Sequence, residues 1–301
     1  MQSQPQTARP GPLRAWLMAI RVPTLPAAVV PVLVGSATAL SDKLFNPLAF
    51  VAAMLASLLI QIGTNLANDY FDHQKGADTA DRLGPTRVTQ SGLIPPSTVR
   101  AMMLASFGLA ALCGAYLIYV GGWPILVIGL LSIAAGILYT GGPFPLGYNG
   151  LGDVFTFIFF GLVAVVGTDY LHSGQLRLVA VFAALPVAML VTAIIVVNNL
   201  RDAPTDRLAG KRTLAVIYGE TFARTEYALL LLGAYLAAPL TWMWGKASPF
   251  VLLVWLSVPL ALDLLERVGK QRGRPLNVAL RDTGRLHMLF GALLTLGLLL
   301  G

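Results

Sequence analysis

The sequence predicts an all-α integral membrane protein with nine transmembrane helices, and three observations support this fold class. Hydrophobic residues make up 56% of the 301 residues and charged residues only 12%, whereas a soluble domain carries about 25% charged residues. The mean hydropathy is +0.72. The apolar residues form continuous runs, and the absence of alternation favours helices over a membrane barrel. A soluble two-domain protein and a disordered chain both need more charge, so both are excluded.

The nine apolar segments are long enough, or nearly so, to cross a bilayer, which requires roughly 20 residues of helix. Helices suit that environment because they satisfy their own backbone hydrogen bonds. We expect one domain over residues 1–301, with residues 1–14 as a polar tail. The segments are residues 16–40, 47–68, 98–120, 123–140, 151–169, 178–200, 222–244, 248–265 and 286–300.

The first segment has an alternative interpretation as a cleavable signal peptide. Arginines precede the apolar run, and Ala37-Thr38-Ala39 has the small-x-small form of a cleavage site. Arg21 and three prolines interrupt the run, which favours a retained helix. If it were cleaved, eight helices would remain.

The basic residues give the chain an orientation. With the amino terminus on the inner side, all Lys and Arg residues lie in inner segments except Lys43, Arg177 and Lys246. This bias is the positive-inside pattern of membrane proteins, and it explains the net charge of +7 without nucleic acid. An inner bacterial membrane with a cytoplasmic amino terminus is the expected location.

Two inner links, residues 69–97 and 201–221, are long and polar, whereas outer links such as 120–122 are short. Both long links follow an Asn/Asp-rich helix end, and Asp81-Arg82-Leu83 in the first matches Asp206-Arg207-Leu208 in the second. We interpret this as a weak internal duplication, with halves of about 15–140 and 141–301 that share one inner site. Chance similarity between short basic loops is the alternative.

Each of the two helix ends carries an acidic cluster on one face. Spacings of three and four residues place Asn65, Asn68, Asp69 and Asp72 together, and Asp78 extends this cluster into the loop. The second cluster consists of Asn198, Asn199, Asp202 and Asp206, provided that the helix continues past Pro204.

These clusters predict a site for a hard metal ion. Carboxylates at a helix C-terminus face the negative end of the helix dipole and repel one another, and a bound cation removes both penalties. Oxygen ligands without His or Cys suit Mg²⁺, which usually completes its shell with water and phosphate oxygens. The scattered histidines and the single cysteine, Cys113, predict no zinc site.

Basic residues in the same loops suit a diphosphate, because Arg and Lys bind phosphate oxygens. Acidic groups for metal, basic groups for phosphate and apolar helices beside them indicate an amphiphilic substrate with a lipid tail. A solvated loop of mixed charge is the simpler alternative. The basic residues are Lys75, Arg82, Arg87, Lys211 and Arg212.

The two motifs, residues 68–72 and 202–206, resemble the Asp-rich motifs of the UbiA-type intramembrane prenyltransferases. Gly76 stands where the first family motif often has a further Asp. That departure, together with the runs 75–92, 139–143, 198–202 and 210–214, resembles the menaquinone branch of the family. The resemblance extends from Arg21 over nearly the whole chain and implies nine helices around a central cavity with a lateral opening.

The resemblance implies transfer of a polyprenyl group from polyprenyl diphosphate to 1,4-dihydroxy-2-naphthoate with loss of CO2, giving a demethylmenaquinone. It implies Mg²⁺ as cofactor and membrane lipid as surroundings. The implied metal ligands are Asn68, Asp69, Asp72, Asp78, Asn198, Asp202 and Asp206. The implied diphosphate-binding residues are the five basic residues with Asn68 and Asn199.

Aromatic side chains near the inner ends are candidates to stabilise an allylic cation, Tyr139 first among them. Tyr70 and Tyr148 are candidates for the aromatic-acceptor side, although interfacial anchoring explains a tyrosine there equally well. Asp153 lines the acceptor side or caps its helix. Arg21 holds the acceptor carboxylate or extends to the inner surface.

Three other functions remain open at this stage. The same chemistry can act on another ring, such as 4-hydroxybenzoate or homogentisate. A secondary transporter also has duplicated halves and intramembrane acids, although usually near the midplane. A non-catalytic protein that binds lipid or quinone would need no paired metal motifs.

Gly108 and Gly114 are expected at close helix contacts.

Overall fold

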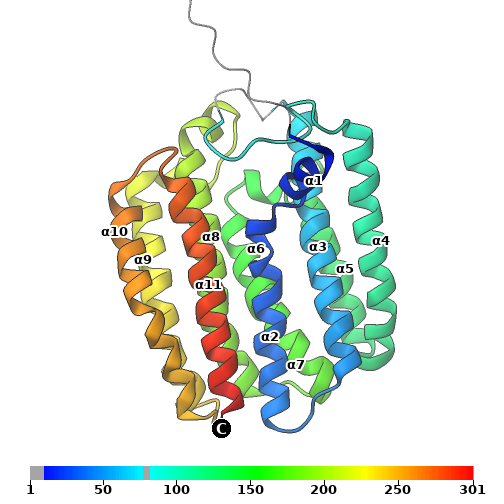
Figure 1. Cartoon of the computed structure of the whole chain (residues 1–301), viewed down its shortest axis with the longest axis vertical. Coiled ribbons are helices and arrows are strands. Elements are labelled where there is room, and N and C mark those ends of the chain that lie inside the picture. Colours follow the sequence, from blue (N-terminus) through cyan, green and yellow to red (C-terminus); the bar gives the residue numbers. More distant parts are fainter. Residues whose placement is uncertain (1–9, 77–81, 301) are drawn as a thin grey trace, which may run out of the picture.

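The computed structural model describes residues 10–76 and 82–300, and throughout these ranges the regular structure is helical. The helices run lengthwise in one bundle (Figure 1), which confirms the predicted all-α fold. In chain order the elements are α1 (Pro12–Ile20), η1 (Val22–Thr24), α2 (Pro26–Ser41), α3 (Pro47–Gln74), α4 (Pro96–Gly121), α5 (Trp123–Leu138), η2 (Leu146–Tyr148), α6 (Gly152–Thr156), η3 (Phe157–Val163), α7 (Ala164–Ser173), α8 (Leu178–Leu208), α9 (Leu214–Met243), η4 (Pro249–Ser257), α10 (Val258–Lys270) and α11 (Leu276–Leu299).

Within the described residues, six helices are long and apolar enough to cross a membrane, or up to seven if the bent pair Pro12–Thr24 and Pro26–Ser41 forms one span. The helix α5 is apolar but shorter, and α11 carries several charges at its start. Each of the nine predicted segments coincides with helical structure, while the number of nine spans stays a prediction.

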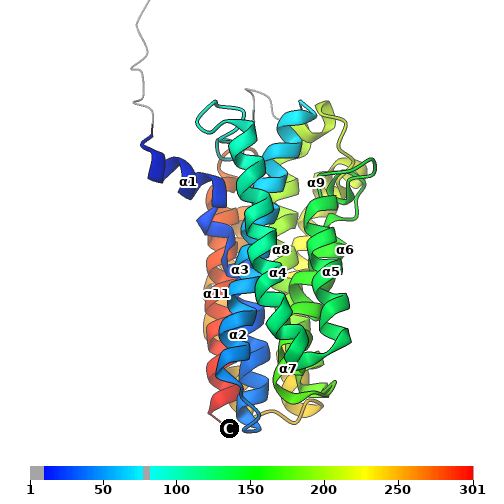
Figure 2. The same ribbon diagram turned by 90° about the vertical axis from the view of Figure 1, so that its right-hand side faces the viewer.

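The chain bends at Arg21, between α1 and α2. Arg21 has a φ of 52°, and the two sides of the break differ in direction by 48°. As a result α1 projects sideways from the bundle (Figure 2), with Leu13 and Leu17 exposed and Ala15 and Ala19 packed against α3. The helix begins at Pro12, inside the segment predicted as a polar tail.

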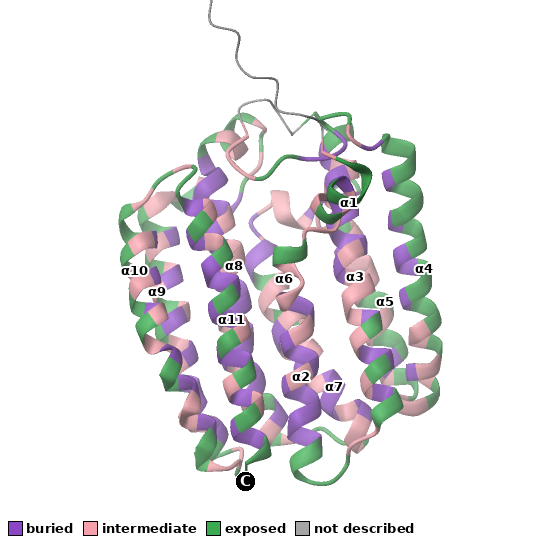
Figure 3. Cartoon of the chain, in the orientation of Figure 1, coloured by how far each residue is buried: buried purple, intermediate pink, exposed green. Residues whose placement is uncertain are grey.

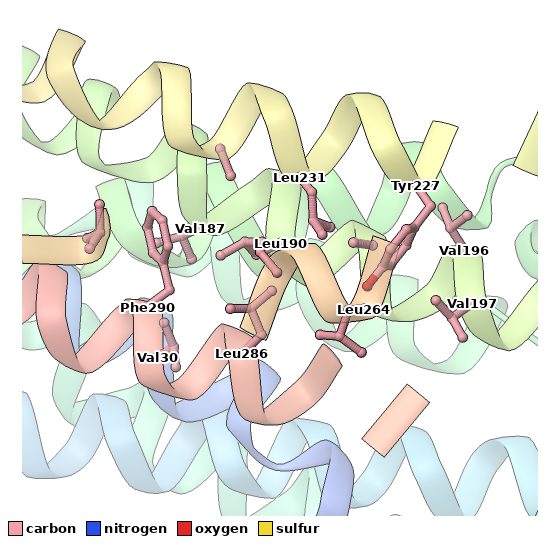
Figure 4. Close-up of a cluster of buried hydrophobic side chains, with 14 of the residues drawn as sticks. Val30, Val187, Leu190, Val196, Val197, Tyr227, Leu231, Leu264, Leu286 and Phe290 are labelled. Atoms are coloured by element: carbon pink, nitrogen blue, oxygen red, sulfur yellow. The ribbon is translucent and has the colours of Figure 1, made fainter. Parts of the chain in front are cut away.

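The helix α8 is the centre of the bundle. Its most apolar window is 61% buried, against 28–33% for the other candidate spans, and exposed residues lie mainly on the outward faces of the peripheral helices (Figure 3). Val187, Leu190 and Val196 of α8 pack against α2, α9, α10 and α11 in the largest core cluster (Figure 4). This cluster includes Val30 and Val34 of α2, from the stretch alternatively interpreted as a signal peptide.

Two helix ends differ from the predicted boundaries. The helix α8 continues past Pro204 to Leu208, where the Thr205 hydroxyl donates to the Asp202 carbonyl at 2.9 Å, so the second acidic face is intact. The helix α9 begins at Leu214, after the Thr213 side chain accepts from the Val216 amide. Gly219, with a φ of 87°, interrupts it just before the predicted start at residue 222.

The end of the bundle opposite the acidic helix ends is held by ion pairs. Arg177, just before α8, pairs with Asp169 of α7 and with Asp42 at the end of α2. The Thr38 hydroxyl also donates to the Asp169 carboxylate at 2.7 Å. Because Asp169 is fully buried, these contacts satisfy a charge that would otherwise be costly.

An apolar cavity of about 280 Å³ lies between α2, α3, α4, α5 and the α6–η3–α7 segment. Its wall is rich in small residues, including Ala53, Ala56, Gly129 and Gly136. It extends from Thr64 and Tyr139, close to the acidic end, toward Leu171 at the other end.

Gly161 of η3 lies at a close helix contact, whereas the contacts expected at Gly108 and Gly114 are not found. A Cβ atom at Gly161 would lie 2.1 Å from the Ala188 Cβ atom of α8. At Gly108 or Gly114 an added Cβ atom meets nothing within 4 Å. That sequence expectation was wrong, because Gly108 is exposed and Gly114 borders the open space of the apolar cavity.

We therefore expect Gly161→Ala to lower the free energy of unfolding by about 1–3 kcal/mol, since the added methyl group must displace the backbone of α8. The matched control Gly108→Ala adds the same atom in open space and should leave stability unchanged or slightly raised. Thermal unfolding in detergent measures both. Equal melting temperatures for the two variants would contradict the close contact.

Candidate active site

The structure brings the two predicted acidic helix ends together at one end of the bundle, the upper end in Figure 1. The ammonium group of Lys211 lies between them, 3.6 Å from Oδ2 of Asp72 and 3.7 Å from Oδ1 of Asp206. One cation therefore contacts a carboxylate from each motif.

Asp72 is the most heavily bonded of these acids. Its side chain is only 2% exposed, and Oδ2 lies 2.8 Å from Nη2 of Arg87. The hydroxyl of Tyr148 donates to Oδ1 at 2.6 Å. The Tyr148 ring also lies beneath two ammonium groups, 4.9 Å from Lys75 and 4.6 Å from Lys211, a distance at which cations and aromatic faces attract.

Asp69 faces the loop that carries Arg87. Its carboxylate accepts hydrogen bonds from the backbone amides of Val88, at 3.2 Å, and Thr89, at 3.3 Å. The buried acid thereby fixes the turn after Arg87 and helps to direct that guanidinium toward Asp72.

Asp202 is held by its neighbour Arg201. The Arg201 guanidinium donates to both carboxylate oxygens, from Nε at 2.8 Å and from Nη2 at 2.5 Å. The same Nη2 donates to the Asn198 amide oxygen at 2.8 Å. This bidentate contact sets the orientation of Asp202 and leaves further lone pairs on its oxygens.

Thr140 connects the first acidic motif to the loop after α5. Its hydroxyl donates to the Asn68 side chain at 2.9 Å, and its carbonyl accepts from Lys75 at 2.6 Å. The pKa of the Lys75 ammonium is lowered, because loss of solvent disfavours its charge more than Asp72 favours it.

The third group consists of Tyr139, Asp153 and Asn199. Asp153 is buried and lies 3.5 Å from the Asn199 amide nitrogen. The Tyr139 side chain lies against two glycines: an added Cβ atom would come within 2.8 Å of its ring at Gly147 and within 2.8 Å of its hydroxyl at Gly152. Tyr139 also lines the apolar cavity, so it stands between the cavity and the polar groups.

Some predicted residues lie apart from this centre. Tyr70 accepts a hydrogen bond from Gln74 and lines a separate groove with His73 and Arg100. Arg21 occupies the bend after α1, but its charge acts on Tyr139, so it is not separate from the centre. Asn65 donates to the Ile20 carbonyl and the Thr24 hydroxyl, so it anchors that bend.

The remaining predictions concern the two loops. Arg82 donates to the Pro85 carbonyl at 3.3 Å. The Arg212 side chain is exposed, while its backbone amide donates to the Tyr148 carbonyl at 2.8 Å. Asp78 lies outside the described residues.

The carboxylate oxygens at this centre are suitable ligands for Mg²⁺. Within residues 10–76 and 82–300, no three Asp, Glu, His or Cys side chains are close enough to hold a metal by themselves. Mg²⁺ needs no such cage, because water and substrate phosphate complete its shell. Asp72 and Asp206 already share the Lys211 cation, and both offer the oxygen ligands that a hard ion prefers.

Sequence reasoning missed Arg201, Thr140 and Asn277 as parts of this centre. A signal existed for Arg201, because a charged residue at the end of a continuous apolar run needs a partner. Nothing local marks Asn277, whose amide oxygen accepts from Arg201 at 2.9 Å. That contact joins residues far apart in the sequence.

Comparisons with known proteins agree with this geometry. The model of the UbiA prenyltransferase family matches residues 28–300. Over 301 residues the chain is 35% identical to the 1,4-dihydroxy-2-naphthoate octaprenyltransferase of Bacillus subtilis, with 99% of this chain and 96% of the relative covered. The enzyme of the same name from Mycobacterium tuberculosis is 38% identical over 285 residues, which cover 94% and 96% of the two chains.

A solved structure has the same fold at low identity. The UbiA homolog from Archaeoglobus fulgidus bound to GPP and Mg²⁺ superposes with a TM-score of 0.68 at 14% identity, covering 95% of this chain and all of that one. Family match, full-length relatives and fold lead to one conclusion: the chain belongs to the UbiA prenyltransferase family.

Proposed function

We propose that this membrane protein transfers a polyprenyl group from polyprenyl diphosphate to 1,4-dihydroxy-2-naphthoate. The observation that carries the proposal is the Lys211 cation between Asp72 and Asp206, next to an apolar cavity that begins at Tyr139. This arrangement suits a substrate with a diphosphate head and a hydrocarbon tail. The near full-length relatives named for that reaction support the choice of acceptor.

The basic residues bind the diphosphate. Arg87, Lys75 and Lys211 surround Asp72 and Tyr148, so phosphate oxygens meet cations on several sides. Arg82 and Arg212 belong to the same two loops, and Asn68 and Asn199 are candidate amide contacts.

Mg²⁺, when bound, neutralises charge on the diphosphate and makes it a better leaving group. The oxygen ligands proposed for it are Asp69, Asp72, Asp202, Asp206, Asn68, Asn198 and Asp78, the last of which lies outside the described residues. Support for magnesium comes from the related Archaeoglobus fulgidus structure bound to GPP and Mg²⁺.

The tail lies in the apolar cavity, where small residues leave room and exclude water. As the bond between the first prenyl carbon and the diphosphate oxygen breaks, positive charge develops on the allylic carbon. Tyr139, which lines the cavity, is the candidate to stabilise that charge through its aromatic face. Exclusion of water protects the cation from hydrolysis to a prenol.

The acceptor lies on the side of Asp153 and Asn199. The ring carbon that carries the carboxylate attacks the allylic carbon, and the carboxylate then leaves as CO2 so that the ring regains aromaticity. The product is the hydroquinone form of demethylmenaquinone. Tyr148 is a second candidate contact for the acceptor, and Arg21, whose charge acts on Tyr139, is a candidate to hold the acceptor carboxylate. Tyr70 lines a separate groove.

We further propose that the site faces the cytoplasm of a bacterial inner membrane. All Lys and Arg residues except Lys43, Arg177 and Lys246 belong to the segments assigned to the same side of the membrane as the site. The halves 15–140 and 141–301, each supplying one acidic helix end, are proposed to descend from one duplicated unit.

The direct test supplies the purified protein with Mg²⁺, labelled octaprenyl diphosphate and one acceptor at a time. With 1,4-dihydroxy-2-naphthoate we expect a prenylated, decarboxylated product by mass and one released diphosphate. Product formed only with 4-hydroxybenzoate would show a different acceptor. No diphosphate release with any acceptor would favour a transporter.

We expect Asp72→Asn to lower kcat at least about 100-fold, because the variant loses a charge that acts on metal and diphosphate together. The control Asp42→Asn makes the same change at the opposite end and should keep nearly full turnover. Steady-state kinetics with the naphthoate acceptor compares the two. Similar losses in both variants would point to general destabilisation instead.

Mg²⁺ together with a non-hydrolysable polyprenyl diphosphate should stabilise the fold, since both bind only the native state. At a ligand concentration about 100 times the Kd the expected gain is about 2.7 kcal/mol. Thermal unfolding in detergent with each ligand alone and with both measures the gain. An unchanged Tm at saturation would argue against a preformed site.

Gly129→Leu should reduce kcat/KM for octaprenyl diphosphate by about tenfold more than for dimethylallyl diphosphate, because the larger side chain fills the cavity where only the long tail extends. Gly129 lines the cavity, and an added Cβ atom there meets nothing within 4 Å. The control Gly108→Leu lies outside the cavity. Equal effects on both donors would place the tail elsewhere.

A further inference from the structure

Arg201 is the most deeply buried cation among the described residues at the site, with 1% of its surface exposed. Beyond Asp202 and Asn198, its Nη1 donates to the side-chain oxygen of Asn277 at 2.9 Å. Asn277 lies in the first turn of α11, a helix that supplies none of the acidic or basic groups of the proposed reaction.

Asn277 also reaches the loop that follows the first acidic motif. Its amide nitrogen donates to the Leu83 carbonyl at 2.9 Å. One amide side chain therefore accepts from Arg201 and donates to the loop. This double contact connects α8, α11 and the loop across a wide sequence separation.

Gly84 completes the contact. A Cβ atom on Gly84 would lie 2.8 Å from Nη2 and 3.1 Å from Cζ of Arg201, so the backbone lies directly against the guanidinium. An arginine tip can usually move aside, but here it holds four hydrogen bonds to three side chains. The glycine is what allows the loop to approach this closely.

We propose that Arg201 and Asn277 are positioning residues that dock the Leu83–Gly84 segment against the end of α8 and keep Asp202 aligned with the basic loop. The inference rests on the proposed function, because it assigns these residues to binding of the diphosphate. Neither side chain contacts the reacting atoms. They set the relative position of Asp202 and of the loop that continues to Arg87.

The test uses two variants that disturb the contact from different sides. Asn277→Ala removes both bonds of the amide, and Gly84→Ala pushes the loop away without altering α11. Each should raise the KM for polyprenyl diphosphate about tenfold, which corresponds to about 1.4 kcal/mol and lies within the net strength of one or two hydrogen bonds. The kcat and the KM for the naphthoate should stay close to the wild-type values.

The matched control is Asp282→Asn. Asp282 lies in the same helix and pairs with Arg267, Arg281 and Arg285, but none of these contacts involves the loop. This variant should lower the melting temperature without changing the KM for the diphosphate. If it raises that KM as much as Asn277→Ala does, the effect comes from loosening α11 and the proposal fails.

A second readout does not depend on turnover. Trypsin cleavage after Arg82 or Arg87, followed by mass spectrometry, should be faster in Asn277→Ala and Gly84→Ala than in Asp282→Asn or wild type. Equal cleavage rates would overturn the docking. If wild type makes no prenylated product but the cleavage rates differ as expected, the proposed function fails while the docking stands.

Discussion

The architecture of the candidate site depends on the neutralisation of carboxylates buried at helix C-termini. Asp72 and Asp202 are almost fully enclosed, and each lies where the helix dipole adds further negative potential. Removing one partner of such a buried pair typically costs about 3–5 kcal/mol, because the other charge is left uncompensated. Arg87, Lys211 and Arg201 are therefore structural necessities before any substrate binds.

The same requirement explains the order of the chain around each motif. Every acidic helix end is followed by a short basic segment that folds back upon it, as Arg87 does on Asp72 and Lys211 on Asp206. Lys211 also contacts Asp72, so the two ends are joined through charge. The metal and diphosphate proposed to bind here would replace these contacts with equivalent ones, so that no buried carboxylate would be left without a compensating charge.

Much of the fold follows from local sequence, because apolar runs and charge placement determine where membrane helices begin and on which side they end. The predicted helix boundaries were less accurate at positions where contacts between distant segments determine where a helix begins or ends. Pro204 argued for an early end of α8, yet the buried pair of Arg201 and Asp202 lies in the turn just before it. The bend at Arg21 turned part of an expected tail into α1.

The acidic and basic residues of the site were identifiable because their types and spacing follow from chemistry. The groups to which these residues bind could not be identified from the sequence in the same way. Asp69 binds backbone amides of a distant turn, and Asn277 meets Arg201 only because α11 returns to α8. Such contacts leave no periodic signature in the sequence. Asn65 shares the acidic face in the pattern, but its amide is used by the bend near Thr24.

The ion pairs of Arg177 give the two ends of the bundle different mechanical character. At that end Asp169 and Asp42 are both paired with Arg177, and neither belongs to the groups proposed to bind substrate. At the acidic end the carboxylates are also paired with protein cations, but these groups are the ones proposed to bind metal and diphosphate. Exchange of the proposed substrate at the acidic end therefore leaves the contacts of Arg177 with Asp169 and Asp42 unaltered, because these groups belong to the opposite end of the bundle.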